Sequence, residues 1–143
     1  MESRQRSAVE IYKDYNAAEN KHDLPGTTAL LATDLFVRVN GKVQVSSSEE
    51  DERAMAILYD CYPDYRREIV AILDAGNQAA IQWKMMGTPS TRFPELEPLE
   101  VSGVSIVTSN GNVLTRAELY ADSIALNEVL NRARNLIERD NHG

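Results

Sequence analysis

Four strand-like segments in the second half of the chain constrain its fold more than any other feature. Each is rich in apolar residues and is bounded by residues that favour turns. The segments are 66–73, 79–86, 101–108 and 113–121, with turns at 74–77 and 109–112. Turns this short join antiparallel strands, because parallel neighbours need a much longer crossover. The sequence therefore predicts an antiparallel meander, interrupted at 87–98 by a proline-containing loop.

Two helices are predicted ahead of this sheet. Apolar residues recur at three- and four-residue intervals, which is typical of a helix with one buried face, at Ala8, Val9, Ile11, Tyr12, Tyr15 and Ala18. This pattern predicts a helix over 7–20. Pro25 and Gly26 then interrupt it, and a short second helix is predicted over 27–32.

A hairpin and a third helix follow. Asn40 and Gly41 separate the strand-like runs 35–39 and 42–45, and this pair readily adopts the positive φ angles of a type I′ turn. Serines and then the acidic run 49–52 provide the N-cap and first turn of a helix that extends to about Tyr59. We interpret the acidic run as complementing the helix dipole rather than as a metal site.

The last strand precedes a final helical pattern, which contains Ile124, Leu126, Leu130, Ala133 and Ile137. The predicted fold class is therefore α+β, with helices and a hairpin first, an antiparallel sheet next and a closing helix. At 143 residues the chain is in the size range of one domain, and no linker divides it, so we expect a single domain over 1–143.

Charge and cysteine content exclude several classes of function. The formal charge of −7 and the absence of a basic stripe argue against nucleic-acid binding. Cys61 is the only cysteine, so no intrachain disulfide can form, which fits a reducing compartment. No apolar stretch predicts a signal peptide or a membrane span, and we expect a cytoplasmic protein that does not contact membranes.

Several short motifs occur in an order that resembles one known family. They are the segment 58–65, which ends a helix with tyrosine, proline and aspartate, the turn 74–77, the strand 81–88 ending in Gly-Thr, and the closing strand with 118–122. In this order they resemble the SnoaL-like polyketide cyclases, a branch of the nuclear-transport-factor-like superfamily. The resemblance implies N-terminal helices packed on a strongly curved sheet that forms a cone around an apolar pocket. Relatives include ketosteroid isomerases, limonene epoxide hydrolases and dehydratases, and also proteins without known chemistry.

The end of the last strand holds the first candidate for chemistry. The resemblance implies that Asp122 acts as an acid/base, and an apolar pocket would raise the pKa of such a carboxyl toward neutrality. Asp122 can equally be the N-cap of the final helix. Strand alternation places it on one face with Glu118 and Tyr120. If that face points inward, the three groups converge on the substrate, and if it points outward they form a solvated face.

Five further residues are candidates for substrate binding or catalysis. Tyr15 and Tyr59, like Tyr12, lie on helices that would cover the mouth of the cone, where a phenol can donate to a carbonyl, although burial of the ring alone would also explain each. Gln82 can hold a carbonyl or lie at an oligomer surface. Trp83 can shape the pocket wall or serve only as core.

No metal or nucleotide cofactor is expected. His22 and His142 lack further ligands at metal-binding spacing, and no glycine-rich phosphate loop is present. The resulting hypothesis is a cofactor-independent cyclase or isomerase of secondary metabolism that acts on an apolar, carbonyl-bearing small molecule. Epoxide hydrolysis, dehydration and a non-catalytic binding module are alternatives. The resemblance also implies a homodimer formed through the outer sheet face, to which 101–108 would contribute apolar residues.

Overall fold

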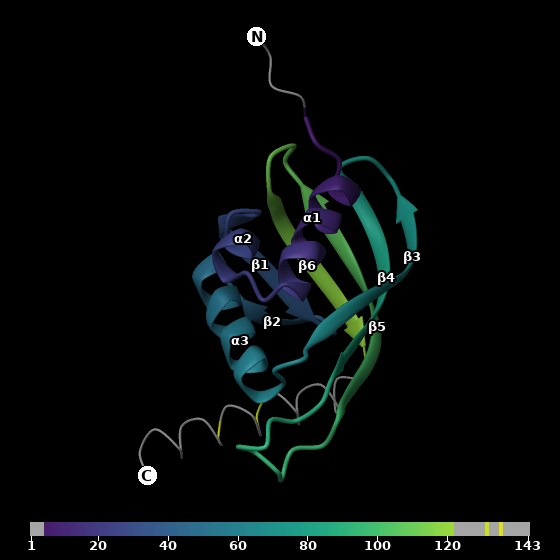
Figure 1. The fold of residues 1–143 in the computed structure, drawn as a ribbon. Helices are drawn as coiled ribbons and strands as arrows, with labels where there is room; N and C mark the ends of the chain where they lie inside the picture. The colour runs from purple at the N-terminus through teal and green to yellow at the C-terminus, as the bar shows by residue number, and fades with distance from the viewer. Residues whose placement is uncertain (1–4, 122–130, 132–134, 136–143) are drawn as a thin grey trace.

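A computed structural model describes residues 5–121 together with 131 and 135. Between residues 5 and 121, three helices pack against one six-stranded sheet (Figure 1). The helices are α1 (Ala8–Asn20), α2 (Leu24–Thr28) and α3 (Ser48–Cys61). The strands are β1 (Leu31–Val39), β2 (Lys42–Val45), β3 (Arg66–Asp74), β4 (Gln78–Gly87), β5 (Leu99–Ser109) and β6 (Leu114–Ala121). The predicted α+β class is confirmed, whereas the predicted final helix and Asp122 lie outside the described residues.

The sheet is mixed and has the strand order β2-β1-β6-β5-β4-β3. The run from β3 to β6 is antiparallel throughout, as predicted. β1 pairs with β6 in parallel, which brings the first and last strands along the described chain side by side. The sheet curls around α1 without closing (Figure 1), and its concave face is the one that the helices cover.

The N-terminal helices form where local capping favours them. The Ser7 side chain accepts a hydrogen bond from the Glu10 amide and caps α1, close to the predicted start. The prediction for the second helix is wrong by about three residues. Asp23 caps α2 through the Gly26 amide, and Pro25 occupies the first turn, where a missing N–H costs nothing. The helix therefore ends earlier, and β1 begins at Leu31 rather than at the predicted Leu35.

The predicted hairpin is confirmed. Asn40 and Gly41 have φ angles of 50° and 84°, the left-handed conformations that a type I′ turn requires. Asn40 also reaches across to β6, because its side-chain amide donates to the Ala121 carbonyl and its side-chain oxygen accepts from the Ala121 amide. The hairpin thus fixes the end of β6.

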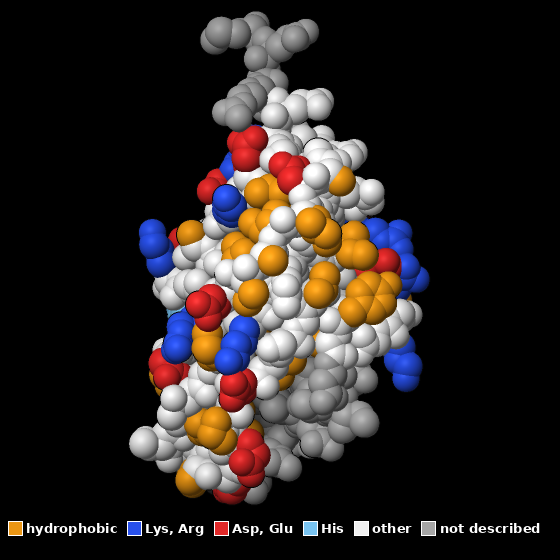
Figure 2. Space-filling model, turned by 90° about the vertical axis from the view of Figure 1, so that its right-hand side faces the viewer, with side chains coloured by type: hydrophobic (Ala, Val, Ile, Leu, Met, Phe, Trp, Pro, Cys, Tyr) orange, Lys and Arg blue, Asp and Glu red, His pale blue; other side chains and the backbone are white. Residues whose placement is uncertain are grey.

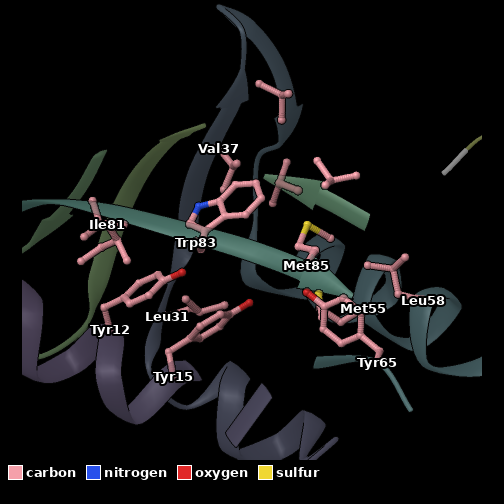
Figure 3. Packing of buried hydrophobic residues seen from close by; sticks show 14 of the residues in the cluster. Tyr12, Tyr15, Leu31, Val37, Met55, Leu58, Tyr65, Ile81, Trp83 and Met85 are labelled. Carbon is pink, nitrogen blue, oxygen red and sulfur yellow. The ribbon is translucent and has the colours of Figure 1, made fainter. Parts of the chain in front are cut away.

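The core lies between the concave sheet face and the helices. Alternate residues of β4 point inward, including Ile81, Trp83 and Met85, and they meet aromatic residues of α1 and the chain segment after α3 (Figure 3). The intervening residues of β4, such as Gln82, point to the convex face. Because this alternation extends across the sheet, the concave face is apolar except for a small number of polar side chains.

Candidate functional site

A cavity of about 90 Å³ lies between the concave sheet face and helices α1 and α3. Most of its wall is apolar and comes from β1, β5, β6 and α3, with Leu35, Val37, Met55, Val107 and Leu119 among the lining residues. Five side chains bring polar atoms to this wall: Tyr12, Tyr15, Asp51, Arg67 and Ser105. A mostly apolar cavity with a few convergent polar groups is the usual form of a small-molecule site.

Asp51 supplies a carboxylate to the cavity from the first turn of α3. It lies one turn before Met55 on the same side of the helix, and both side chains line the cavity. Tyr15 of α1 donates a hydrogen bond of 3.0 Å to its Oδ2. Burial raises the pKa of Asp51 to about 6, with Glu19 adding to the rise while Tyr15 and Arg67 oppose it.

A buried ion pair stands beside this carboxylate. Glu19 of α1 is fully buried, and its Oε2 accepts a 2.8 Å hydrogen bond from the Tyr65 hydroxyl and lies 3.7 Å from Arg67 Nη2. Arg67 Nη1 in turn donates to the Tyr12 hydroxyl at 3.3 Å. Burial raises the pKa of Glu19, and the positive charge of Arg67 opposes that rise. The pair places a fixed guanidinium on the cavity wall.

Trp83 and Ser105 support the same part of the wall. The Arg67 guanidinium lies 4.6 Å from the centre of the Trp83 ring, and Trp83 Nε1 donates to Ser105 Oγ at 2.7 Å. The indole fits because Gly103 lies opposite it on β5, where a Cβ would come within 2.7 Å of the ring. Trp83 is fully buried and is not itself a lining residue. It contacts and positions two residues that do line the cavity, Arg67 and Ser105.

Figure 3 shows how the aromatic side chains are oriented. The hydroxyl groups of Tyr12 and Tyr15 both point from α1 toward the sheet. Trp83 lies on the sheet, across from the two tyrosines. The structure therefore places both Tyr15 and Tyr12 on the cavity wall, and whether Tyr15 binds substrate stays a prediction.

Tyr59 is not among the residues that line this cavity. Its hydroxyl donates to the Glu19 carbonyl at 2.9 Å, and its ring stacks on His22 with a centroid distance of 4.0 Å. Burial is the main cause of the rise in its pKa. Tyr59 thus holds the end of α1 against α3, which is a structural role in this conformation.

Gln82, Glu118 and Tyr120 lie on the convex face of the sheet. On β6, Ala117 and Leu119 line the cavity, so the alternate residues Glu118 and Tyr120 point away from it. Glu118 pairs there with Arg38 and Arg116, and the arrangement in which Glu118 and Tyr120 reach an interior substrate does not occur. The apolar side of the strand is buried because the concave face packs on the core. Asp122 is outside the described residues, so its role stays a prediction.

Four residues of the site were not predicted from the sequence: Glu19, Asp51, Arg67 and Ser105. Two of them had a usable signal. Glu19 continues the buried stripe of α1 one turn after Tyr15, and Asp51 precedes Met55 by one turn. The members of the acidic run differ in their surroundings. Glu49 is 78% exposed, and the Glu50 carboxylate accepts a hydrogen bond from the Ser46 amide. Asp51, in contrast, faces the cavity.

Two absences hold for the described part of the chain. No group of three histidine, cysteine or carboxylate side chains there is arranged to hold a metal ion. Within the same residues, no helix is long and apolar enough to cross a membrane.

Fold and cavity together define a curved-sheet protein with a mostly apolar interior cavity. The model of the SnoaL-like domain matches residues 12–117, and the chain belongs to this family. No curated protein matches significantly.

Solved structures share the fold at low identity. A candidate SnoaL-like polyketide cyclase from Jannaschia sp. CCS1 is 13% identical, with a TM-score of 0.69, covering 90% of this chain and 97% of its own. A nuclear-transport-factor-like protein of unknown function from Cytophaga hutchinsonii is 12% identical, with a TM-score of 0.67 and coverage of 88% and 98%. A candidate ketosteroid isomerase from Kribbella flavida is 16% identical, with a TM-score of 0.60 and coverage of 78% and 75%. At these identities the likeness concerns the fold.

Proposed function

We propose that this protein is a cofactor-independent enzyme of the cyclase or isomerase type, which moves a proton on an apolar, carbonyl-bearing small molecule inside the cavity. The observation that carries the proposal is the Asp51 carboxyl, which lies on a largely apolar wall, is hydrogen-bonded by Tyr15 and has a pKa of about 6. A carboxyl with that pKa is ionised at neutral pH and still basic enough to accept a proton from carbon. The family and the named neighbours support the same class of reaction.

The reaction begins when the Asp51 carboxylate takes a proton from the carbon next to the substrate carbonyl. The C–H electron pair then forms the enolate double bond, and the carbonyl π pair moves to oxygen. In an isomerisation, protonated Asp51 returns the proton to another carbon of the enolate. In a cyclisation, the enolate carbon attacks a second carbonyl, and the alkoxide that forms takes the proton from Asp51. Either sequence leaves the enzyme unchanged.

Asp122 remains a second proposed acid/base, carried by the resemblance of the closing strand to the family pattern. Asp51 lies on the cavity wall, whereas Asp122 is proposed from the resemblance alone, so we expect substitutions of the two residues to have different effects. Substitution of each residue separately distinguishes them. Epoxide opening and dehydration would use the same cavity, with the carboxyl acting on water or a hydroxyl, and the product would identify them.

The test uses a small β,γ-unsaturated cyclic ketone, because its conversion to the conjugated enone is a proton transfer that absorbance follows directly. We expect Asp51→Asn to lower the rate by about 10²-fold or more, the usual contribution of a general base. Glu49→Gln is the matched control, since Glu49 belongs to the same acidic run but is exposed. Full activity in Asp51→Asn together with its loss in Asp122→Asn would transfer the role to Asp122. Full activity in both variants would refute the carboxylate mechanism.

We further propose that the protein forms a homodimer through the convex face of the sheet. Hydrophobic side chains gather on this face (Figure 2), and the exposed ones include Leu73 on β3, Ile106 on β5 and Tyr120 on β6. The ladder pairs Leu73 with Ala80, Ala80 with Ile106 and Val104 with Tyr120, so these side chains share one surface. A contiguous exposed apolar surface of this kind is typical of a protein interface.

A further inference from the structure

We propose that Tyr12 and Ser105 form a binding subsite for one uncharged oxygen of the ligand, a ketone or aldehyde carbonyl, with Arg67 hydrogen-bonded to the Tyr12 hydroxyl. This inference rests on the proposed function and specifies the substrate class for the same cavity. Both side chains line the cavity, Tyr12 from α1 and Ser105 from β5. They approach it from opposite sides, since α1 covers the concave face to which β5 contributes.

The hydrogen-bond partners of the two hydroxyls indicate what the subsite lacks. The Tyr12 oxygen accepts a bond from Arg67 Nη1, and the Ser105 oxygen accepts one from Trp83 Nε1. A hydroxyl that accepts still has one proton to donate. Among the described residues no acceptor takes the proton of either hydroxyl. Each hydroxyl is therefore oriented by the buried donor from which it accepts, while its own proton remains free to donate.

Tyr15 provides the contrast within the same wall. Its hydroxyl donates to Asp51 Oδ2, so its proton is already used. The cavity wall thus contains a carboxylate with its phenol partner and, in addition, two free donors, one from α1 and one from β5. A ligand with an acceptor oxygen at Tyr12 and Ser105, and an acidic C–H at Asp51, would engage both the two donors and the carboxylate.

Charge favours an uncharged oxygen over a carboxylate. Arg67, the cation that donates to the Tyr12 hydroxyl, is already paired with the buried Glu19 carboxylate at 3.7 Å. A second carboxylate would enter a low-dielectric space that also holds Asp51, where like charges repel strongly. A neutral carbonyl avoids this cost. When its neighbouring carbon loses a proton to Asp51, one negative charge moves from Asp51 to the oxygen, and the total charge of the cavity does not change.

The hydroxyl of Tyr12 remains a donor over the physiological range. Its pKa is raised by burial, which exceeds the lowering effect of Arg67. Arg67 polarises the phenol through the hydrogen bond to its oxygen and thereby strengthens the bond that the phenol donates, as hydrogen bonds in a chain do. Hydroxyls fixed in advance in this way stabilise a developing oxyanion without reorganising.

The experiment compares three probes of similar size by ligand-observed NMR titration: 2-cyclohexenone, cyclohexene and cyclohexanecarboxylate. We expect the ketone to bind wild-type protein at least about 5-fold more tightly than the hydrocarbon or the carboxylate, the value of one net hydrogen bond. Tyr12→Phe and Ser105→Ala each remove one proton donor without adding bulk. Each is expected to weaken ketone binding about 5- to 10-fold and to leave cyclohexene binding unchanged.

Ser102→Ala is the matched control, because Ser102 lies on the same strand but is exposed on the convex face. Melting temperatures of all variants verify folding. The proposal is overturned by unchanged ketone affinity in both Tyr12→Phe and Ser105→Ala, by preference for the carboxylate, or by no ketone binding to the wild-type protein. Asp51→Asn separates the two proposals: full turnover with ketone binding that still depends on Tyr12 refutes the proposed catalysis and leaves the subsite standing.

Discussion

At the scale of single residues, the site consists of groups whose protonation depends on burial. Asp51 faces Tyr15 and Glu19 from α1 and Arg67 from β3, and burial outweighs the groups that favour its ionised form. Arg67 and Glu19 are buried together as an ion pair, so removal of either one leaves an uncompensated buried charge. The structure therefore makes separate predictions for the lone carboxyl and for the ion pair.

The first residue-scale prediction concerns stability and pH. The folded pKa of Asp51, about 6, is higher than the ordinary value of 3.8. Its contribution to stability is therefore present at pH below 3.8 and is lost as the pH rises through 6. Asp51→Asn resembles the protonated form and avoids this loss. We expect the free energy of unfolding of the variant to rise relative to that of wild type by about 1–3 kcal/mol between pH 4 and pH 7.5, as measured by urea unfolding. A constant difference between the two proteins across this range would contradict the raised pKa.

The second concerns the buried pair. Arg67→Met leaves the Glu19 carboxyl without its cation, and we expect a loss of about 3–5 kcal/mol in the free energy of unfolding at pH 7.5. Glu19→Gln with Arg67→Met removes both charges and is expected to recover most of that loss. Urea unfolding of the single and double variants checks this. If the two substitutions are simply additive, the pair does not act as a unit.

At the scale of elements, the sequence predicts strands better than their partners. Turn residues mark the strand ends, so β3 to β6 agree with the prediction to within two residues. The parallel pairing of β1 with β6 has no local signal, because it joins segments about eighty residues apart. The start of β1 was missed because Asp23 and Pro25 shift α2 toward the N-terminus.

The same limit applies to the site. Alternation placed Glu118 and Tyr120 on one face, but only packing against the helices decides which face points inward. Arg67 lies between Arg66 and Glu68 in a strand, and its burial depends on Glu19 from a distant helix. The position of Tyr15 on the buried face of α1 could be predicted because its helical stripe is a local pattern.

The element-scale prediction concerns the contact between β4 and β5. A Cβ at Gly103 would lie 2.7 Å from the Trp83 ring and 2.8 Å from the Tyr120 carbonyl oxygen. We expect Gly103→Ala to cost about 1–3 kcal/mol through overpacking and to displace the indole from Ser105. Urea unfolding and the fluorescence of Trp83, the only tryptophan, measure both effects. Ser102→Ala, at the neighbouring position, should change neither. Unaltered fluorescence in Gly103→Ala would contradict the packing described.

At the scale of the whole molecule, the two faces of the sheet differ in what they carry. The concave face holds the cavity, and the convex face carries the exposed apolar surface (Figure 2). A dimer formed through the convex face would leave the polar wall of the cavity unchanged. Ile106→Glu places a charge in that surface and is expected to give a monomer in light scattering coupled to size-exclusion chromatography. Ala56→Glu on α3 is the control, being exposed away from the sheet. A wild-type monomer at high concentration would contradict the dimer.

The most direct test of the central claim is the pH dependence of kcat/KM for isomerisation of the β,γ-unsaturated ketone by the wild-type protein and by Asp51→Asn. The account predicts a wild-type rate that rises with pH, with a midpoint near the Asp51 pKa of about 6, and then levels. In Asp51→Asn the rise should be absent and the rate low throughout. The same profile in both proteins would show that Asp51 is not the base and would contradict the account.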